Sequence, residues 1–341
     1  MSDVISVGGP WFEDFEVGDR FDDVPAVTVT EAHTVFYQGL FGDRSRLPLD
    51  SELSSKVTGR TGLVNNLLVG NIAIGLSTVP SQRVLGNLFY RGLAFLRPVF
   101  VGDTLTATTE VLALRQNRIR EGRAASGMVA LAIKVTNQRH ETVMSFTRCP
   151  MIPCRDPAAD TSRADSFESI AERLATDLLE EAVPNWDLKA YRGTVGGPHF
   201  EELKEGTIYS AEARDTVTSA PELVRLTLNL AMTHTDVQRS AYAQRLVYGG
   251  HTISMAGAQM MRVFPALVSI LGWQYCDHTA PVFEGDMLSS HVAVRGLTPL
   301  GAGRGGIARL HVTVNAERGA GTPDPGSTVG VLDWELAAHF A

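Results

Sequence analysis

Residues 98–105 read Pro-Val-Phe-Val-Gly-Asp-Thr-Leu, and residues 281–288 read Pro-Val-Phe-Glu-Gly-Asp-Met-Leu. Other pairs of segments recur in the same order at nearly the same separation: Phe12 to Phe21 with Phe200 to Tyr209, Val29 to Ala32 with Val217 to Ala220, and Leu63-Val64 with Leu246-Val247. Repeats of this kind indicate that a chain is built from copies of one structural unit. The 341-residue chain is therefore predicted to be a tandem duplication.

Each copy shows the same order of elements. A short segment ending in a glycine turn precedes a helix, for which the second copy offers Ser219 as N-cap and Pro221 in the first turn. A central apolar helix is predicted over residues 65–76 in the first copy and 251–263 in the second. Alternating strands close each copy, among them residues 104–112, 128–135, 288–294 and 307–314. A long helix wrapped by an antiparallel sheet is a hotdog fold, so the predicted class is α+β, a double hotdog.

The repeat also predicts how the chain divides. An N-terminal hotdog is expected over residues 1–154 and a C-terminal hotdog over residues 194–341. Residues 155–193 are first rich in Pro, Asp and Ser and then show helical spacing from Phe167 to Leu179, which predicts a surface linker containing a helix.

One glycine-rich motif points to a different fold and is set aside. Gly301 to Gly306 matches the pattern G-x-G-x-x-G, which binds dinucleotides when it follows a strand and opens a helix. Here an alternating, strand-like segment follows it. A hairpin turn is the expected structure.

Composition and charge exclude several classes of protein. The chain is 44% hydrophobic and 20% charged, no apolar run approaches the ~20 residues of a membrane helix, and the N-terminus lacks a signal-peptide pattern. The chain has three cysteines, Cys149, Cys154 and Cys276, an odd number without metal-ligand spacing. Disulfides are therefore not expected, which favours a reducing cytoplasm. A net charge of −8 argues against nucleic acid but not against an anionic small ligand held by local arginines. Candidates for such contacts are Arg91, Arg97, Arg239 and Arg245.

The candidate catalytic residues are Asn229, His234 and Asp236. Asn229 and His234 would lie roughly 140° apart on a regular helix, so they can share a pocket only if the helix ends or bends between them. The alternative is a polar helix end, in which all three only cap or solvate the helix.

The first copy provides an internal comparison for these residues. The repeat aligns Asn229 with Asp43, His234 with Pro48 and Asp236 with Asp50. Only the second copy therefore carries an imidazole at this place. One catalytic copy and one supporting copy are predicted.

A second candidate stretch, Tyr248-Gly249-Gly250-His251, stands where a loop becomes the central helix. Glycines allow a ligand to approach the backbone, and free N–H groups at a helix start stabilise negative charge, such as that of an enolate oxygen. The matching residues 65–67 of the first copy lack the glycines. A tight helix entry without a ligand is the alternative, and His251 is expected either to contact the ligand or to cap the helix.

These motifs resemble a known family. The pattern N-x-A-x-x-H-x-D at residues 229–236, followed by R-L-V-Y-G-G-H-x-I-S at residues 245–254, is similar to the MaoC-like (R)-specific enoyl-CoA hydratase superfamily, and within it to mesaconyl-CoA hydratases, also called β-methylmalyl-CoA dehydratases. The superfamily pattern G-D-x-N-P-x-H has an Asp where this chain has Asn229. An amide can hold a water molecule but cannot take its proton.

The resemblance implies a hydro-lyase that reversibly hydrates an enoyl-CoA thioester, with mesaconyl-CoA and β-methylmalyl-CoA as the expected pair. In this interpretation His234 transfers the proton, Asn229 orients water or thioester, Asp236 orients the imidazole or only caps, and the Gly250 amide stabilises the enolate. Tyr248, Gly249, Gly250 and His251 are the expected substrate-binding residues.

The resemblance implies no metal and no cofactor, because CoA is part of the substrate. The expected protein is a cytoplasmic homodimer or larger homo-oligomer that binds neither nucleic acid nor membrane. Alternatives are an (R)-specific enoyl-CoA hydratase or 3-hydroxyacyl-thioester dehydratase of another chain type, a non-catalytic acyl-CoA binding protein, and a thioesterase, because hotdog folds host several chemistries.

Overall fold

The fold was analysed in a computed structural model that describes residues 5, 7–170, 173–301 and 303–341. The first half of the chain contains two short 3-10 helices, η1 (Phe12–Asp14) and η2 (Val79–Ser81). Its helices and strands are β1 (Arg20–Phe21), β2 (Val27–Thr28), α1 (Glu31–Phe41), α2 (Arg46–Leu49), α3 (Ser51–Thr58), α4 (Asn66–Leu76), β3 (Gly86–Phe95), β4 (Thr104–Gln116), β5 (Ser126–Thr136) and β6 (Thr142–Pro153).

A connecting segment holds α5 (Thr176–Ala182) and α6 (Leu188–Thr194). The second half then repeats the order of the first, as η3 (Phe200–Glu202), β7 (Ile208–Ser210), β8 (Asp215–Thr216), α7 (Ala220–Leu226), η4 (Met232–His234), η5 (Val237–Arg239), α8 (Gly249–Val263), β9 (Leu267–His278), β10 (Met287–Pro299), β11 (Gly306–Glu317) and β12 (Thr328–Phe340).

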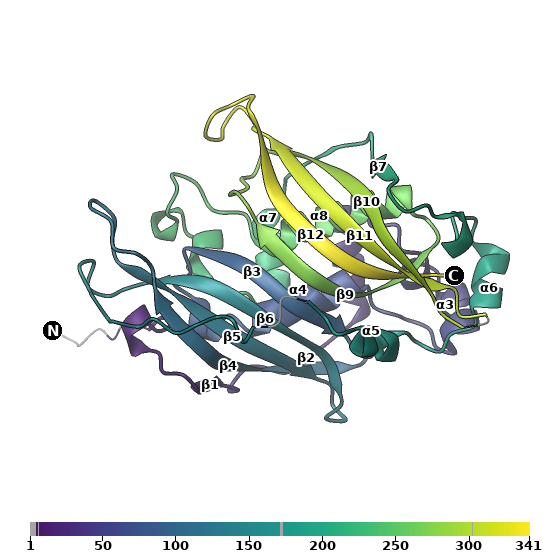
Figure 1. The fold of residues 1–341 in the computed structure, drawn as a ribbon, viewed down its shortest axis with the longest axis horizontal. Helices are drawn as coiled ribbons and strands as arrows, with labels where there is room; N and C mark the ends of the chain where they lie inside the picture. The colour runs from purple at the N-terminus through teal and green to yellow at the C-terminus, as the bar shows by residue number, and fades with distance from the viewer. Residues whose placement is uncertain (1–4, 6, 171–172, 302) are drawn as a thin grey trace.

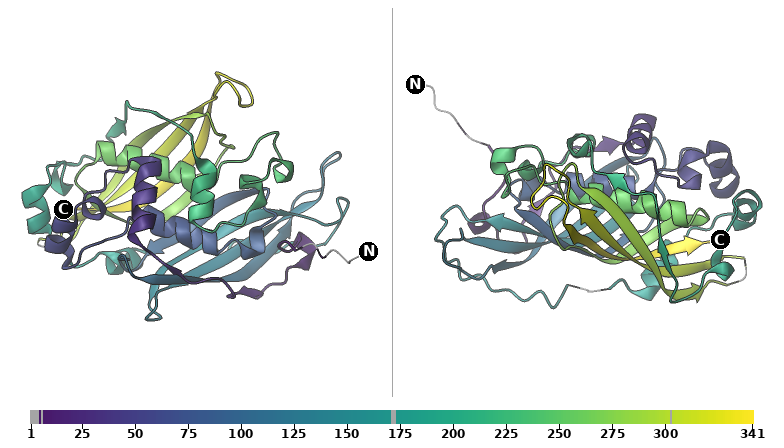
Figure 2. Two further views of the ribbon diagram at one scale, coloured as in Figure 1. Left: turned by 180° about the vertical axis from the view of Figure 1, so that it is seen from behind. Right: turned by 90° about the horizontal axis from the view of Figure 1, so that it is seen from above.

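The strands of both halves form one sheet. In the described part of the chain this sheet has 12 strands, in the order β1-β4-β5-β6-β3-β9-β12-β11-β10-β7, with β2 on β4 and β8 on β10. Read outward from the β3–β9 pair, the order is the same in both directions, as a duplication predicts. Helices α4 and α8 lie on one face of the sheet, and α5 packs on the opposite face against β3 and β9 (Figures 1 and 2).

The repeated Gly-Asp motif forms the same turn in both halves. Gly102 and Gly285 have φ angles of 95° and 96°, a conformation that favours glycine. The Asp after each glycine accepts a backbone N–H three residues back, Phe100 to Asp103 and Phe283 to Asp286, both at 2.9 Å. The motif therefore recurs because the same turn precedes β4 in the first half and β10 in the second.

The two central helices approach each other closely. Every residue of α4 from Leu67 to Leu76 is buried, and α8 is buried from Gly250 to Met261. A Cβ at Gly257 would lie 2.2 Å from Leu67 Cδ1, so any larger residue there would displace the Leu67 side chain. Asn71 donates from Nδ2 to Ser254 Oγ at 2.9 Å, which satisfies a polar group inside the apolar layer.

The structure confirms the predicted central helices and strands with small shifts, since α8 begins at Gly249 rather than His251. The Gly301 to Gly306 segment is the hairpin turn between β10 and β11, although Ala302 lies outside the described residues.

The helix predicted from Phe167 is wrong in extent, because α5 begins only at Thr176. Leu174 N–H donates to the Gln274 side chain at 2.8 Å, so the sheet holds this segment outside a helix. Residues 171–172 of the predicted helix lie outside the described residues. Among the helices that the structure describes, none is both long enough and apolar enough to cross a membrane.

A pair of glycines in α4 tests the packing of this helix against the second half. A Cβ at Gly75 would lie 1.8 Å from the carbonyl oxygen of Thr227, a backbone atom that cannot move alone, whereas a Cβ at Gly70 would meet Phe95 at an ordinary 3.6 Å. We expect Gly75→Ala to lower the free energy of unfolding by about 3 kcal/mol. Gly70→Ala, the matched control, should change it by less than about 1 kcal/mol. Urea denaturation followed by circular dichroism measures both, and equal effects would contradict the close contact.

Candidate active site

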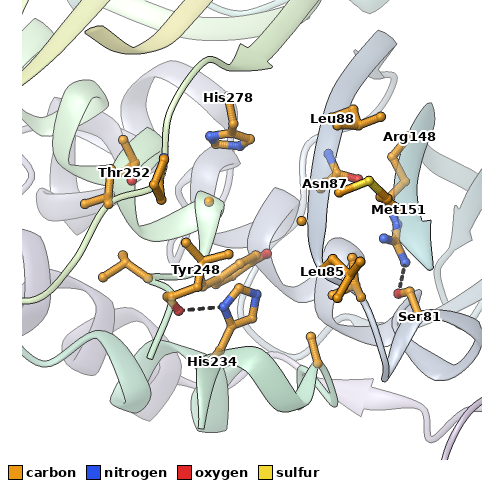
Figure 3. A pocket seen from close by; sticks show the side chains of 18 of the residues that line it. Ser81, Leu85, Asn87, Leu88, Arg148, Met151, His234, Tyr248, Thr252 and His278 are labelled. Carbon is orange, nitrogen blue, oxygen red and sulfur yellow. Dashed lines mark hydrogen bonds between the residues drawn. The ribbon is translucent and has the colours of Figure 1, made fainter. Parts of the chain in front are cut away.

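A cavity of about 240 Å³ lies where the two halves meet. The first half lines it with the end of α4, η2, β3 and two residues of β6. The second half lines it with the segment after α7, the start of α8 and the end of β9. Figure 3 shows the side chains of both halves converging on this space. Neither half alone would enclose it.

The segment after α7 is held in place by the first half. Helix α7 ends at Leu226, before Asn229, so the helix does not separate Asn229 and His234, and both line the cavity. Leu230 N–H donates to Thr78 Oγ1 at 2.9 Å, and Met232 N–H donates to the Gln82 carbonyl at 2.8 Å. The sequence required the helix to end or bend between Asn229 and His234, and in the structure it ends before both.

The tautomer of His234 follows from its hydrogen bond. Nδ1 lies 2.8 Å from the carbonyl oxygen of Leu246, which can only accept, so Nδ1 carries the hydrogen. Nε2 is then the unprotonated nitrogen and faces the cavity (Figure 3). Burial lowers the pKa of His234 to about 4, although the Leu246 carbonyl acts in the opposite direction. The ring is therefore neutral at pH 7 and can accept a proton.

Asn229 has the same local geometry as its counterpart in the first half. Its Oδ1 accepts the Ala231 N–H at 2.9 Å, and Asp43 Oδ1 accepts the Ser45 N–H at 2.8 Å. The alignment of Asn229 with Asp43 thus holds in three dimensions. Because Oδ1 is used by the backbone, the amide hydrogens on Nδ2 are the part of Asn229 that can hold water or a carbonyl oxygen.

The start of α8 forms another wall of the cavity. Tyr248 and Gly249 line it, and Tyr248 packs beside His234 with ring centroids 5.5 Å apart. The amides of Gly249 and Gly250 have no acceptor among the described residues, as expected for the first turn of a helix. A helix start with free N–H groups favours a negatively charged oxygen.

Three of the predicted site residues do not line the cavity. Asp236 is exposed and caps η5, where it accepts the Gln238 N–H at 2.9 Å, so it does not orient His234, and the Leu246 carbonyl contacts Nδ1 instead. His251 is buried against Phe41, with ring centroids 4.8 Å apart. Gly250 is also buried, and a Cβ there would lie 1.8 Å from Asn71 Oδ1. Gly250 therefore lacks a side chain because α8 packs closely on α4 at this point.

The structure also places a second histidine and an arginine in the cavity that sequence reasoning missed. His278, at the end of β9, lines it beside Gly249, and burial together with neighbouring His234 lowers the pKa of His278 to about 4. Arg148 of β6 lines it from the other half. The repeat contained a signal for His278. His278 aligns with Phe95 of the first copy, so this position, like that of His234, carries an ionisable side chain in the second copy only. Arg148 was missed because its neighbour Tyr90 lies across the β3–β6 pair, a contact that only the fold creates.

Relatives of known name align with most of the chain, although a scan against models of protein families found no match. The chain is 30% identical over 285 residues to the mesaconyl-CoA hydratase of Cereibacter sphaeroides, across 82% of this chain and 81% of that protein. It is 29% identical over 312 residues to the β-methylmalyl-CoA dehydratase of Chloroflexus aurantiacus, across 86% of each.

Solved structures share the fold of this chain. A conserved protein of Mycobacterium tuberculosis, described as a double hotdog, superposes with a TM-score of 0.87 at 40% identity, across 98% of this chain and 99% of that one. A MaoC domain protein of Chloroflexus aurantiacus superposes with a TM-score of 0.80 at 24% identity, across 99% of each, which supports the fold alone. The predicted double hotdog is confirmed. The chain belongs to the family of mesaconyl-CoA hydratases, also called β-methylmalyl-CoA dehydratases.

Proposed function

We propose that this protein is a hydro-lyase that adds water to, and removes water from, the α,β-carbon pair of an acyl-CoA thioester, with mesaconyl-CoA and β-methylmalyl-CoA as its substrate pair. The observation that carries the proposal is His234, a neutral imidazole whose tautomer leaves a basic nitrogen in a cavity between two hotdog units. Relatives that are named for this reaction support the substrate pair.

In the hydration direction the reaction begins at a water molecule held by the Asn229 amide. His234 Nε2 takes a proton from this water, and its oxygen attacks the β-carbon. Negative charge then develops on the thioester oxygen, which the free N–H of Gly249 at the start of α8 stabilises. The imidazolium of His234 returns its proton to the α-carbon. The cavity ends the cycle without a net change in charge.

The absence of acidic groups from the cavity suits this single-base mechanism. No Asp or Glu is among the described residues that line it. A carboxylate beside His234 would raise its pKa and make the imidazolium a weaker acid toward the α-carbon. A desolvated imidazolium gives its proton back readily, because burial disfavours the charged form.

The first test removes the base. We expect His234→Ala to lower kcat/KM for mesaconyl-CoA by about 1,000-fold, because general base catalysis is lost. Loss of the conjugated enoyl-thioester absorbance measures the rate. Asp236→Asn is the matched control and should leave the rate unchanged, since Asp236 is exposed and only caps η5.

The same assay distinguishes the alternatives. Turnover of crotonyl-CoA alone would mark an enoyl-CoA hydratase of another chain type. Turnover of neither mesaconyl-CoA nor crotonyl-CoA would point to a different acyl group or to an acyl-CoA binding protein, and release of free thiol would mark a thioesterase. Full activity in His234→Ala would overturn the assignment of the base.

A second test uses pH. Because burial lowers the pKa of His234 to about 4, the base stays unprotonated from neutral pH downward until the pH approaches that value. We expect kcat/KM for hydration to remain flat down to about pH 5 and to fall below it. Circular dichroism at each pH controls for unfolding, and a midpoint near 6.5 would contradict a desolvated His234.

A further inference from the structure

Arg148 is a buried cation in the cavity without a counter-ion. Its side chain is 3% exposed. Nε donates to Ser77 Oγ at 3.0 Å, and Nη2 donates to the Ser77 carbonyl at 2.6 Å and to Ser81 Oγ at 2.8 Å. All of these partners are neutral, and no described carboxylate forms an ion pair with Arg148. A buried charge left in this state is costly unless a ligand neutralises it.

The side of Arg148 toward the cavity remains available. Nη1 has no acceptor among the described residues, although the other two nitrogens are saturated from the end of α4 and from η2. These contacts fix the plane of the guanidinium. A fixed guanidinium with a free edge is suited to a planar anion such as a carboxylate.

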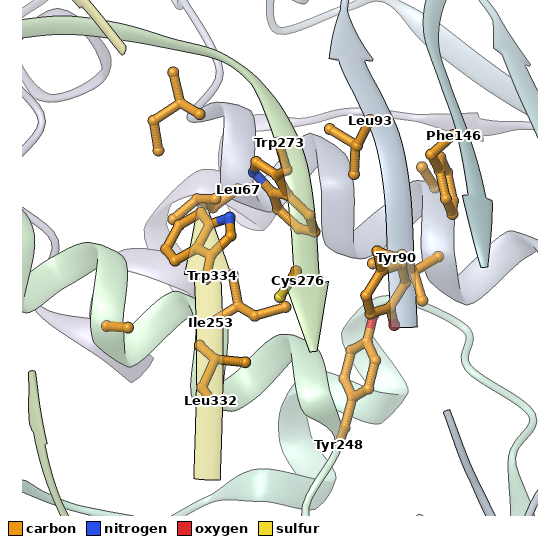
Figure 4. Close-up of a cluster of buried hydrophobic side chains, with 14 of the residues drawn as sticks. Leu67, Tyr90, Leu93, Phe146, Tyr248, Ile253, Trp273, Cys276, Leu332 and Trp334 are labelled. Carbon is orange, nitrogen blue, oxygen red and sulfur yellow. The ribbon is translucent and has the colours of Figure 1, made fainter. Parts of the chain in front are cut away.

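Two tyrosine hydroxyls complete this part of the cavity. Tyr90 stands directly opposite Arg148 in the β3–β6 pair, so the two side chains share one face of the sheet. Tyr248 reaches the same place from the start of α8, and Figure 4 shows the hydroxyl ends of Tyr90 and Tyr248 directed toward each other. Both tyrosines are buried and line the cavity. The Tyr248 hydroxyl already donates to the Asn71 carbonyl oxygen at 3.5 Å. Arg148 Nη1 and the Tyr90 hydroxyl are therefore the donors without an acceptor among the described residues, at a place where those residues supply no anion.

The arginines considered from sequence are poor candidates for this role. None of Arg91, Arg97, Arg239 and Arg245 lines the cavity. Arg91 pairs with Asp277, and Arg245 pairs with Glu284 at 2.8 Å. The only arginine that lines the cavity within the described part of the chain is Arg148.

We propose that Arg148, with the hydroxyl of Tyr90, binds a free carboxylate carried by the β-carbon of the acyl group, and so selects acyl-CoA thioesters of dicarboxylic acids. This inference rests on the proposed function for the identity of the reaction. A phosphate of CoA is the other anion present in the ligand. A phosphate is bulkier and more highly charged than a carboxylate. To reach the buried Arg148 side chain between the two halves, a phosphate would have to lose its hydration.

The test compares ligands that differ only in this carboxylate. Methylsuccinyl-CoA and 2-methylbutyryl-CoA lack the double bond, so calorimetry measures their binding without turnover. We expect the wild-type protein to bind methylsuccinyl-CoA on the order of 100-fold more tightly. Arg148→Gln should abolish this preference, and Tyr90→Phe, which removes one hydroxyl and little else, should reduce it by about tenfold. Arg91→Gln, which changes the residue next to Tyr90 in β3, is the matched control and should preserve the preference for methylsuccinyl-CoA.

Turnover separates recognition from a structural role of Arg148. With mesaconyl-CoA and its methyl analogue tiglyl-CoA as substrates, Arg148→Gln should lower kcat/KM about 100-fold for the first and leave the second unchanged. Equal losses of kcat/KM for mesaconyl-CoA and tiglyl-CoA would mean that Arg148 has a structural role and only holds the end of α4.

Other outcomes overturn the inference in different ways. Equal binding of the two saturated ligands by the wild-type protein would exclude a carboxylate site, and this result does not depend on whether Arg148→Gln folds. Free CoA that loses as much affinity as methylsuccinyl-CoA in Arg148→Gln would show that the anion is a phosphate. A carboxylate preference in binding without hydration of either enoyl-CoA would instead overturn the proposed function and leave the inference standing.

Discussion

The close contact between α4 and α8 is the constraint on which the rest of the molecule depends. Two buried, apolar helices can cross this closely only where side chains are missing, and Gly250 and Gly257 of α8 provide the space for Asn71 and Leu67 of α4. The contact brings the start of α8 over the end of α4. It thereby places Tyr248 and Gly249 beside the strands of the first half and creates a cavity that belongs to both halves.

Duplication allows the two halves to take different tasks. The first half keeps a carboxyl at Asp43, whose pKa is raised by burial, next to a cavity of about 210 Å³, but Pro48 stands where an imidazole would be needed. What the first half supplies instead is support. Thr78 and Gln82 anchor the segment that carries His234, and β3 and β6 contribute Tyr90 and Arg148. The base and the helix start come from the second half.

The sequence predicted the fold and part of the site for identifiable physical reasons. A repeated Gly-Asp turn has to recur wherever the same strand pair starts, so the duplication and the central helices could be found from residue types alone. Asn229 and His234 could be found because one copy differs from the other. Asp236 and His251 were assigned from their nearness in sequence, which does not determine the direction of a side chain. Arg148 was missed because only the fold brings β6 opposite the segment of His234.

Burial has the same effect on the histidines and on the arginine of the cavity: it lowers their pKa, because a low dielectric disfavours any charge that lacks a partner. For His234 and His278 this keeps the rings neutral, which a base requires before it takes a proton. For Arg148 the same burial lowers the pKa of the guanidinium, but arginine keeps its charge over the whole physiological range. The cavity therefore combines neutral bases with one permanent cation. A ligand with a single negative charge at the matching end neutralises that cation without placing charge on the imidazoles, so the surroundings that tune the base also favour a particular acyl group.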